Sequence, residues 1–170
     1  MKKIAISGKS GCGNTTVSQL LAKELDIPCI NFTFRNLAQE LGLDLSDLLE
    51  KAQQDDSWDK NLDERQVSLA RAVRNGCVLG SRLAIWLLPE ADLKVYLCAS
   101  ALTRVHRIVE REGGDSTHVM SFTMERDRQD RERYKRIYGI DNDDYSFALV
   151  VDTDTMKPPA IVQYIIKHLP

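Results

Sequence analysis

The sequence predicts a three-layer α/β protein, in which a parallel β-sheet is covered by helices on both faces. Short, uniformly apolar segments of the kind that form buried strands recur along the chain, and segments with apolar residues at helical spacing separate them. Strands that alternate with helices in this way pair in parallel. A glycine-rich loop also lies between the first apolar segment and the first helical one, where phosphate-binding α/β folds carry such a loop.

The N-terminal part of the chain predicts a strand, a loop, a helix and a second strand. Residues 4–6 form the first apolar segment, and the loop covers residues 7–16. The helix that follows has apolar residues at the spacing of one helix face, namely Val17, Leu20, Leu21 and Leu25. Pro28 then introduces a second predicted strand over residues 29–32.

Three helices are predicted in the next part of the chain. Residues 34–41 have apolar side chains at helical spacing, and Gly42 ends that helix. A second helix runs over residues 46–52, and the polar interval of residues 53–60 is predicted as a loop. Residues 62–73 are again helical, because their apolar side chains recur on one face.

The second half of the chain returns to strands that alternate with helices. Residues 77–79, 93–98 and 149–151 are predicted strands, since they are short and almost wholly apolar. The predicted helices cover residues 103–109, the charged segment 122–138, and a terminal segment from Pro158 to Leu169.

Length and composition predict one soluble domain. The chain has 170 residues, which is enough for one sizeable core and short for two domains, so residues 1–170 are expected to form a single unit. Hydrophobic residues make up 43% and charged residues 28%, as in globular proteins. The net charge of −2 and the pI of about 5.9 argue against a general binder of nucleic acid or of acidic membranes.

The cysteines argue against a metal site, and the apolar segments argue against secretion and a membrane span. The four cysteines lack the spacing of metal ligands and are expected to be reduced thiols: Cys12, Cys29, Cys77 and Cys98. No charged-then-apolar leader opens the sequence, and no apolar run approaches the roughly 18 residues of a membrane span. We therefore expect a cytoplasmic protein.

The glycine-rich loop has the sequence GKSGCGNTT over residues 8–16. Gly8 and Gly13 stand at the two glycine positions of the pattern GxxxxGK[ST], in which backbone N–H groups surround a polyphosphate at a helix N-terminus. Thr15 stands where the pattern has its Mg²⁺-binding hydroxyl, and Asn14 stands where it has lysine. The order of strand, loop and helix predicts a phosphate site, with a chance turn as the alternative.

The charged helix over residues 122–138 is predicted to be a lid. Arg126, Asp130 and Arg133 lie at positions i, i+4 and i+7, so they project from one face. Glycines flank this helix and permit it to move, and its arginines can then neutralise the charge on a transferred phosphoryl group. The lid would span about residues 113–140. A solvated helix with surface ion pairs is the alternative, and interleaved acids argue against a nucleic-acid-binding helix.

With loop, central strand and lid in place, the sequence resembles the short archaeal type of cytidylate kinase, a family within the P-loop nucleoside monophosphate kinases. The resemblance covers nearly the whole chain in the family's order. Its most specific block is RERYKRIYGID over residues 131–141. The other matching segments are residues 4–17, 63–66, 81–86 and 91–95.

The resemblance implies a P-loop NTPase fold and transfer of the ATP γ-phosphate to CMP or dCMP, with Mg²⁺ bound together with ATP. It implies that Thr15 binds the metal and that Arg126 and Arg133 close on the phosphates. The ATP phosphates would be held by Gly8, Lys9, Ser10, Gly11, Cys12, Gly13, Asn14, Thr15 and Thr16.

On the acceptor side, the resemblance implies a CMP-binding segment over about residues 33–76. Two candidate residues lie in this segment, Arg35 and Arg65. The other two are Arg82, which follows the predicted strand over residues 77–79, and Asp130 of the predicted lid. The alternative for each is a surface charge or a structural ion pair.

Two positions depart from the family pattern. Asn14 replaces the lysine that bridges the β- and γ-phosphates, and a neutral amide donates hydrogen bonds but cannot neutralise charge. Gly80 stands where family members usually carry an acidic residue that organises metal and water. We expect Lys9 to act as a catalytic residue that supplies the missing charge together with Arg126 and Arg133. A solvent-facing lysine is the alternative.

Three functions compete. An active CMP or dCMP kinase is the leading prediction, because this chemistry needs mainly positioning and electrostatic stabilisation. A degenerate nucleotide-binding protein without phosphotransfer is the main alternative, and Asn14 and Gly80 favour it. A kinase of another small acceptor, such as UMP, is the third. The expected partners are ATP and CMP or dCMP, with no nucleic acid and no membrane, and the chain is expected to be a monomer.

Overall fold

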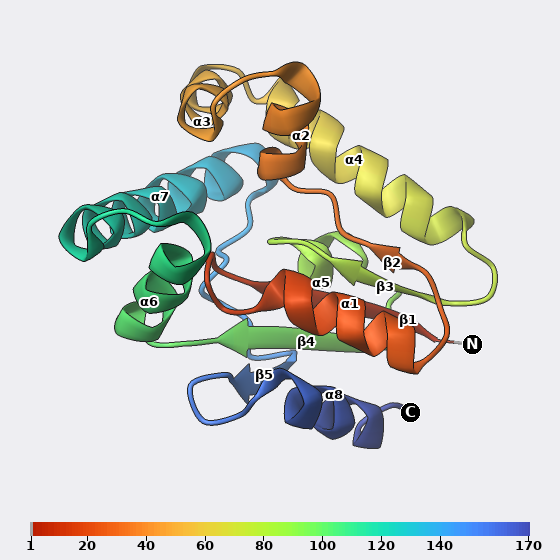
Figure 1. Cartoon of the computed structure of the whole chain (residues 1–170). Coiled ribbons are helices and arrows are strands. Elements are labelled where there is room, and N and C mark those ends of the chain that lie inside the picture. Colours follow the sequence, from red (N-terminus) through yellow and green to blue (C-terminus); the bar gives the residue numbers. More distant parts are fainter. Residues whose placement is uncertain (1) are drawn as a thin grey trace.

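The sheet lies at the centre of the chain. The computed structural model describes residues 2–170 and contains, within them, one sheet of five strands that all run parallel (Figure 1). Its strand order is β2-β3-β1-β4-β5. The strands are β1 (Lys3–Gly8), β2 (Cys29–Ile30), β3 (Cys77–Gly80), β4 (Leu93–Cys98) and β5 (Leu149–Asp152). Each lies on a predicted apolar segment, and the predicted α/β fold class is confirmed.

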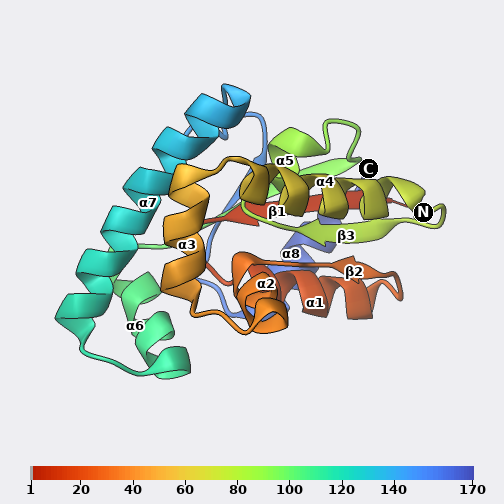
Figure 2. The ribbon, with the colours of Figure 1, turned by 90° about the horizontal axis from the view of Figure 1, so that it is seen from above.

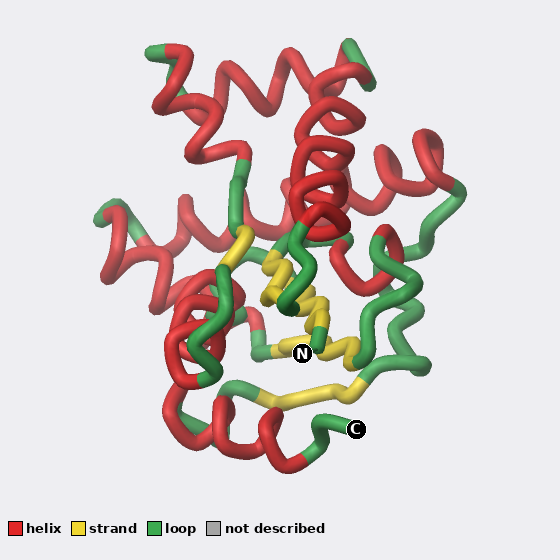
Figure 3. Tube along the Cα trace, turned by 90° about the vertical axis from the view of Figure 1, so that its right-hand side faces the viewer, coloured by secondary structure: helices red, strands yellow, loops and turns green. Residues whose placement is uncertain are grey.

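Helices connect the strands and cover the sheet. In the described residues they are α1 (Asn14–Glu24), α2 (Phe34–Leu41), α3 (Leu45–Gln54), α4 (Ser57–Ala72), α5 (Ala84–Leu87), α6 (Ala101–Glu112), α7 (Ser116–Tyr138) and α8 (Pro158–Lys167). Figure 3, which looks along the strands, shows helices on both sides of the sheet. The three-layer arrangement therefore agrees with the prediction.

Alternating side chains of β1 build the two main cores, because successive residues of a strand point to opposite faces. Ile4 and Ile6 are fully buried in the cluster that includes α1 and α8 residues. Ala5 is fully buried on the other face, in the cluster that includes α4 and α5 residues. Figure 2 shows α1 and α4 on opposite sides of β1 and β3. The central strand is thus covered on both faces.

The remaining helices lie toward the end of the sheet where β1 and β4 finish. A third apolar cluster joins α2, α3 and α4, with Phe34, Leu48 and Leu62 among its buried residues. Helices α6 and α7 pack against each other beside the arrowhead of β4 (Figure 1). These helices therefore surround the carboxyl ends of the central strands, which is where ligands bind in open parallel sheets.

The predicted loop over residues 53–60 is wrong, because α3 continues to Gln54 and α4 begins at Ser57. The sequence of this segment shows no apolar face because the side chain that it buries is a carboxylic acid. Asp59 is 1% exposed, and its Oδ2 accepts a hydrogen bond of 2.7 Å from Nε of Arg133 on α7. This partner is distant in sequence, so hydrophobic spacing could not reveal the buried face.

Two further differences concern helix boundaries. Helix α7 begins at Ser116, well before the predicted start at residue 122, because the Asp115 side chain accepts a hydrogen bond of 2.9 Å from the His118 backbone N–H and caps the helix. Helix α5 (Ala84–Leu87) was not predicted. Along residues 2–170, no helix combines the length and apolar character that crossing a membrane requires.

Candidate active site

The glycine-rich loop joins β1 to α1. Gly13, which precedes α1, has a φ of 92°, in the left-handed region that favours glycine. A Cβ atom on Gly8 would lie 2.7 Å from the carbonyl oxygen of Leu97 on β4, which is too close for a side chain. Both glycines of the predicted loop pattern are therefore required by the backbone.

A cavity of about 370 Å³ opens beside this loop. Its lining includes the two predicted acceptor-side arginines Arg35 and Arg82, and Arg126 of the predicted lid. Most of the predicted ATP-binding residues also line it, namely Gly8, Lys9, Ser10, Gly11, Gly13, Asn14, Thr15 and Thr16. Residues predicted for three parts of one site thus meet in one cavity.

Cys12 is the predicted ATP-binding residue that does not line the cavity. It is 2% exposed and packs in the core, and its backbone N–H donates to the carbonyl oxygen of Lys9 at 3.1 Å. Burial raises the pKa of the Cys12 thiol, whereas a reactive cysteine needs a lowered pKa. The Cys12 side chain therefore acts in core packing, and a contact of Cys12 with ATP stays a prediction.

The charge of the cavity is mainly positive. Its charged lining consists of the cations Lys9, Arg35, Arg82, Arg111 and Arg126 and the carboxylates Asp59 and Asp63. Clefts lined by charge of one sign concentrate ligands of the opposite sign. The cavity is therefore suited to a ligand with several negative charges.

Arg126 of α7 lacks a protein partner for part of its guanidinium. Its Nε is buried and has no hydrogen-bond partner within residues 2–170. Burial, and next the positive charge of Arg82, lower the pKa of Arg126 to about 9. An unpaired buried donor indicates a missing partner, and an anion in the cavity would satisfy it. This geometry supports the predicted phosphate-binding role of Arg126.

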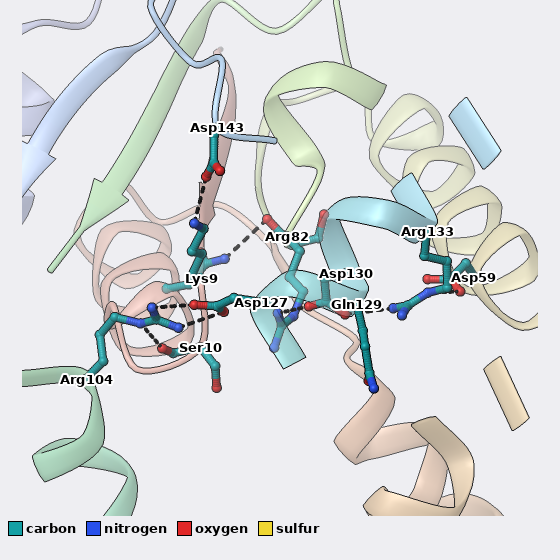
Figure 4. Close-up of polar contacts among 12 residues, drawn as sticks. Lys9, Ser10, Asp59, Arg82, Arg104, Asp127, Gln129, Asp130, Arg133 and Asp143 are labelled. Atoms are coloured by element: carbon teal, nitrogen blue, oxygen red, sulfur yellow. Dashed lines mark hydrogen bonds and ion pairs between the residues drawn. The ribbon is translucent and has the colours of Figure 1, made fainter. Parts of the chain in front are cut away.

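Asp130 and Arg133 occupy different places from those predicted. Arg133 donates from Nη2 to Asp130 Oδ1 at 2.9 Å and from Nε to Asp59 at 2.7 Å, and Arg82 also pairs with Asp130 (Figure 4). Arg133 is 1% exposed and Asp130 is 2% exposed, and neither lines the cavity. Nη1 of Arg133 is buried without a hydrogen-bond partner within residues 2–170, so its contact with phosphate, like that of Asp130 with cytidine, stays a prediction. Here Asp130 instead holds Arg82.

The other two predicted acceptor residues differ from each other. Arg35 lines the cavity and pairs with Glu112 at 2.8 Å. Arg65 lies outside the lining, with its guanidinium carbon 4.2 Å from the centre of the Phe32 ring and its Nη1 3.7 Å from Glu40. The position of Arg35 supports an acceptor-phosphate contact, and the position of Arg65 does not.

Lys9 and Asn14 lie on the cavity but have protein partners. Lys9 Nζ is 2.6 Å from Asp143 Oδ1 (Figure 4). Asn14 Nδ2 donates to the carbonyl oxygen of Ser81 at 3.2 Å, and its Oδ1 accepts from the Ser18 hydroxyl at 3.3 Å. The side chain that replaces the usual lysine therefore ties the start of α1 to the chain after β3. A neutralising role for Lys9 stays a prediction.

Sequence reasoning did not single out Arg104 of α6. This residue is 5% exposed, its Nε donates to the carbonyl oxygen of Ser10 at 2.7 Å, and its other nitrogens bind the Asp127 carboxylate at 2.7 and 2.9 Å (Figure 4). It thereby joins the loop to α7. The sequence did offer one signal that Arg104 is buried. In the predicted helix it lies beside the apolar residues Val105 and Ile108, which are also buried.

Asp63 of α4 was also missed as a site residue. It lines the cavity, and the Tyr138 hydroxyl donates to its Oδ2 at 2.8 Å. Burial raises the pKa of Asp63 to about 7, assisted by the charge of Asp59 and opposed by the hydrogen bond from Tyr138. A carboxyl group that titrates near neutrality therefore faces the cavity.

The residues present fit a magnesium ion that arrives with a nucleotide. Within residues 2–170, no group of three or more His, Cys, Asp or Glu side chains is placed to hold a metal by itself. The Thr15 hydroxyl lines the cavity and donates to Asn31 Oδ1 at 3.3 Å. Mg²⁺ prefers oxygen ligands and usually takes few of them from protein, with phosphates and water supplying the rest. Thr15 is therefore the residue that would hold it.

Comparisons with known proteins point to one family. The model of the cytidylate kinase-like family matches residues 3–155. "Cytidylate kinase 2" of Borreliella burgdorferi is 46% identical over 168 residues, covering 96% of this chain and 92% of the relative. "Cytidylate kinase" of Methanocaldococcus jannaschii is 36% identical over 157 residues, covering 88% and 87%. The solved structure of deoxyadenosine kinase from M. mycoides with bound dATP has a TM-score of 0.62 at 18% identity, with 98% of each chain covered, and shows a shared P-loop kinase fold.

Proposed function

The chain belongs to the cytidylate kinase-like family, and from this membership we propose that it transfers the γ-phosphoryl group of ATP to CMP or dCMP, giving CDP or dCDP. The observation that carries the proposal is the cationic cavity, which brings the glycine-rich loop, two acceptor-side arginines and an unpaired arginine of α7 together. A phosphate donor and a phosphate acceptor both need such surroundings.

The reaction needs no nucleophile from the protein. The bond between the γ-phosphorus and the oxygen that bridges it to the β-phosphorus breaks, and an oxygen of the CMP phosphate forms the new bond. Because that oxygen belongs to an anionic phosphate, no base has to remove a proton from it. The residues of the chain therefore act by positioning both phosphates and by neutralising charge.

Each part of the cavity has a proposed role. The loop backbone holds the ATP phosphates, as expected for N–H groups at a helix N-terminus. The Thr15 hydroxyl holds Mg²⁺, which, when bound, neutralises charge on the donor phosphates. Arg35 and Arg82 contact the acceptor phosphate, and Asp130 keeps Arg82 in place. Arg126 contacts the transferred group, for which its unpaired Nε is available.

The proposed lid movement is limited to the N-terminal turns of α7. From Asp127 onward, this helix is fastened by buried or partly buried pairs of Asp127 with Arg104, of Arg133 with Asp59 and of Tyr138 with Asp63. The turns before Asp127 begin after Gly113 and Gly114, both with positive φ, and residues 113–118 are exposed. Closure by these turns covers the cavity beside Arg126, which already lines it.

Two alternatives differ in their support. A degenerate protein without phosphotransfer has no support from the comparisons, whose matched relatives carry the name cytidylate kinase. A kinase of another small acceptor is distinguished by comparing CMP, dCMP, UMP and AMP. We further propose that the enzyme acts in the cytoplasm. We also propose that it is a monomer, since residues of a single chain supply every role above.

A coupled assay of ADP release tests the proposed function. With ATP and Mg²⁺ present, ADP should appear only when CMP or dCMP is added, together with an equal amount of CDP or dCDP. ADP formation without an acceptor would indicate hydrolysis, and a higher kcat/KM for UMP or AMP would assign another acceptor. Calorimetric binding of CMP without any product would contradict phosphotransfer.

A further inference from the structure

We propose that Asn31 positions the metal-binding hydroxyl of Thr15 by accepting a hydrogen bond from it, in place of the carboxylate that position 80 lacks. This inference rests on the proposed function, because it concerns the metal that accompanies ATP. It names a positioning residue outside the glycine-rich loop, on the chain just after β2.

The chemistry of a threonine ligand explains the need for such a residue. A hydroxyl binds a metal through its oxygen lone pairs, so its hydrogen has to point to another acceptor. In P-loop enzymes the metal is held by the loop hydroxyl together with an acidic residue from a neighbouring strand. Partners that orient a metal ligand affect metal affinity although they do not touch the metal. Here the Thr15 hydroxyl donates to Asn31, with Thr15 Oγ1 and Asn31 Oδ1 3.3 Å apart.

The Asn31 side chain is held in the orientation that this role requires. Its Nδ2 donates to the carbonyl oxygen of Gly80 at 2.8 Å, so its Oδ1 faces Thr15. The reversed amide would place Oδ1 against the carbonyl oxygen, which is unfavourable because both are acceptors. Asn31 thus links the end of β3 to the loop hydroxyl, as an acidic side chain on β3 would.

The space beside Gly80 shows why no acidic side chain stands at this position. A Cβ atom on Gly80 would lie 2.4 Å from Ser18 Oγ, 2.9 Å from Ser18 Cβ and 3.0 Å from Asn31 Nδ2. Ser18 is fully buried and cannot move into solvent. Glycine at position 80 is therefore the residue that accommodates the other two side chains.

The same network includes the other departure from the family pattern. The Ser18 hydroxyl that fills the space beside Gly80 donates to Asn14 Oδ1 at 3.3 Å, and Asn14 Nδ2 donates to Ser81 at 3.2 Å. The replacements of lysine by Asn14 and of an acid by Gly80 are thus parts of one hydrogen-bonded arrangement. In this arrangement the acceptor for Thr15 comes from Asn31.

Manganese binding tests this role without turnover. Mn²⁺ replaces Mg²⁺ as a paramagnetic probe, and its affinity for the protein with a non-hydrolysable ATP analogue is measured by electron paramagnetic resonance. Asn31→Ala should weaken Mn²⁺ binding roughly ten- to a hundredfold, as for other partners of metal ligands. Affinity for the analogue without metal should stay within about twofold, because the loop backbone that binds phosphate is unchanged. Asn61→Ala, at an exposed position on α4, is the matched control and should change neither value.

Asn31→Asp keeps an acceptor for Thr15 but cannot donate to the Gly80 carbonyl oxygen, so it should weaken Mn²⁺ binding by no more than about tenfold and less than Asn31→Ala does. This variant also serves if Asn31→Ala does not fold. Unchanged Mn²⁺ affinity in Asn31→Ala would overturn the proposal. An equal loss of metal-free analogue binding would also overturn it, because it would show that Asn31 merely packs the loop. A folded Asn31→Asp whose Mn²⁺ affinity falls by more than about tenfold would do the same.

The outcome is separable from that of the proposed function. Mn²⁺ and the analogue bind without any acceptor, so the role of Asn31 stands if CMP is not phosphorylated but the metal measurements follow the expected pattern. The reverse result, CMP-dependent turnover with unchanged Mn²⁺ affinity in Asn31→Ala, leaves the kinase assignment intact and removes Asn31 from it.

Discussion

Lys9 Nζ lies 2.6 Å from Asp143 Oδ1, so the glycine-rich loop is joined to the segment after α7 by an ion pair (Figure 4). The two side chains are 28% and 37% exposed, and such partly exposed pairs are weak because water screens them. The ammonium can therefore exchange Asp143 for a phosphate when a nucleotide enters the cavity.

Lys9→Met should lower kcat/KM for ATP by roughly ten- to a hundredfold, because it removes a cation from a site where developing charge has to be neutralised. Steady-state kinetics at saturating CMP measures this effect. Asp143→Asn is the matched control, since it removes the partner and leaves the ammonium, and should change kcat/KM by no more than about threefold. Unchanged turnover in Lys9→Met would return Lys9 to the role of a surface lysine.

Arg126→Met should separate activity from stability. It should lower kcat/KM by about 10²- to 10³-fold, as expected for loss of a preorganised donor. At pH 7 it should raise the free energy of unfolding by roughly 1–3 kcal/mol, because burial and Arg82 lower the pKa of Arg126 to about 9 and its charge is therefore unfavourable in the folded state.

Urea denaturation and ADP release measure these two effects. Arg128→Met is the control on the same helix, because Arg128 is exposed and pairs with Glu125 and Glu132. It should change the free energy of unfolding by no more than about 0.5–1 kcal/mol. A destabilised but active Arg126→Met would contradict the assignment of Arg126 to phosphate binding.

Arg133→Met should act mainly on stability. It leaves Asp59 and Asp130 buried without Arg133, and removing one partner of a buried pair destabilises by about 3–5 kcal/mol. Thermal and urea unfolding check this value. Addition of Asp59→Asn should recover part of the loss, because it removes one of the unpaired charges. Normal stability together with lost turnover would instead restore Arg133 to the phosphate-binding role that the sequence suggested.

Asp63 should make stability depend on pH between about 4 and 7. Burial raises its pKa from 3.8 to about 7, so the folded protein holds this proton where the unfolded chain has lost it. The stabilisation is complete below pH 3.8 and is lost as the pH rises through about 7. Relative to Asp63→Asn, the wild-type free energy of unfolding should fall over this range by up to about 4 kcal/mol, at about 1.4 kcal/mol per pKa unit.

Urea unfolding of both proteins at several pH values between 4 and 8 measures this difference. Comparison with Asp63→Asn cancels the titration of the other carboxyl groups. Tyr138→Phe removes the hydrogen bond that favours the carboxylate and should move the transition to higher pH. A difference between wild type and Asp63→Asn that does not vary with pH would show that Asp63 titrates in its ordinary range.

The parts predicted from sequence are those with local signals. Each strand follows an apolar run, and the loop follows a pattern of glycines whose backbone requirements the structure confirms. Helical spacing also placed Arg126, Asp130 and Arg133 on one inward face of α7. Spacing could not tell which of them meets the cavity, because the answer depends on Asp59, a carboxylate on another helix.

The parts that were missed depend on contacts between distant segments. Asn31 is 16 residues from Thr15 and 49 residues from Gly80, and no local pattern marks it as their partner. The buried face of α4 is hidden in the sequence because it carries Asp59 in place of an apolar residue. In each case a polar side chain is held by a partner that lies elsewhere in the fold.

The most direct test of the central claim is CMP-dependent ADP release by the wild-type protein beside Asn14→Lys. The account holds that this loop transfers phosphate without the usual lysine, because Arg126, Lys9 and the acceptor-side arginines supply the charge. It predicts turnover by the wild type, and a kcat/KM for Asn14→Lys within about tenfold of it, since the new cation is offset by loss of the hydrogen bond to Ser81. A wild-type protein that binds ATP and CMP but releases no ADP, next to an active Asn14→Lys, would contradict the account.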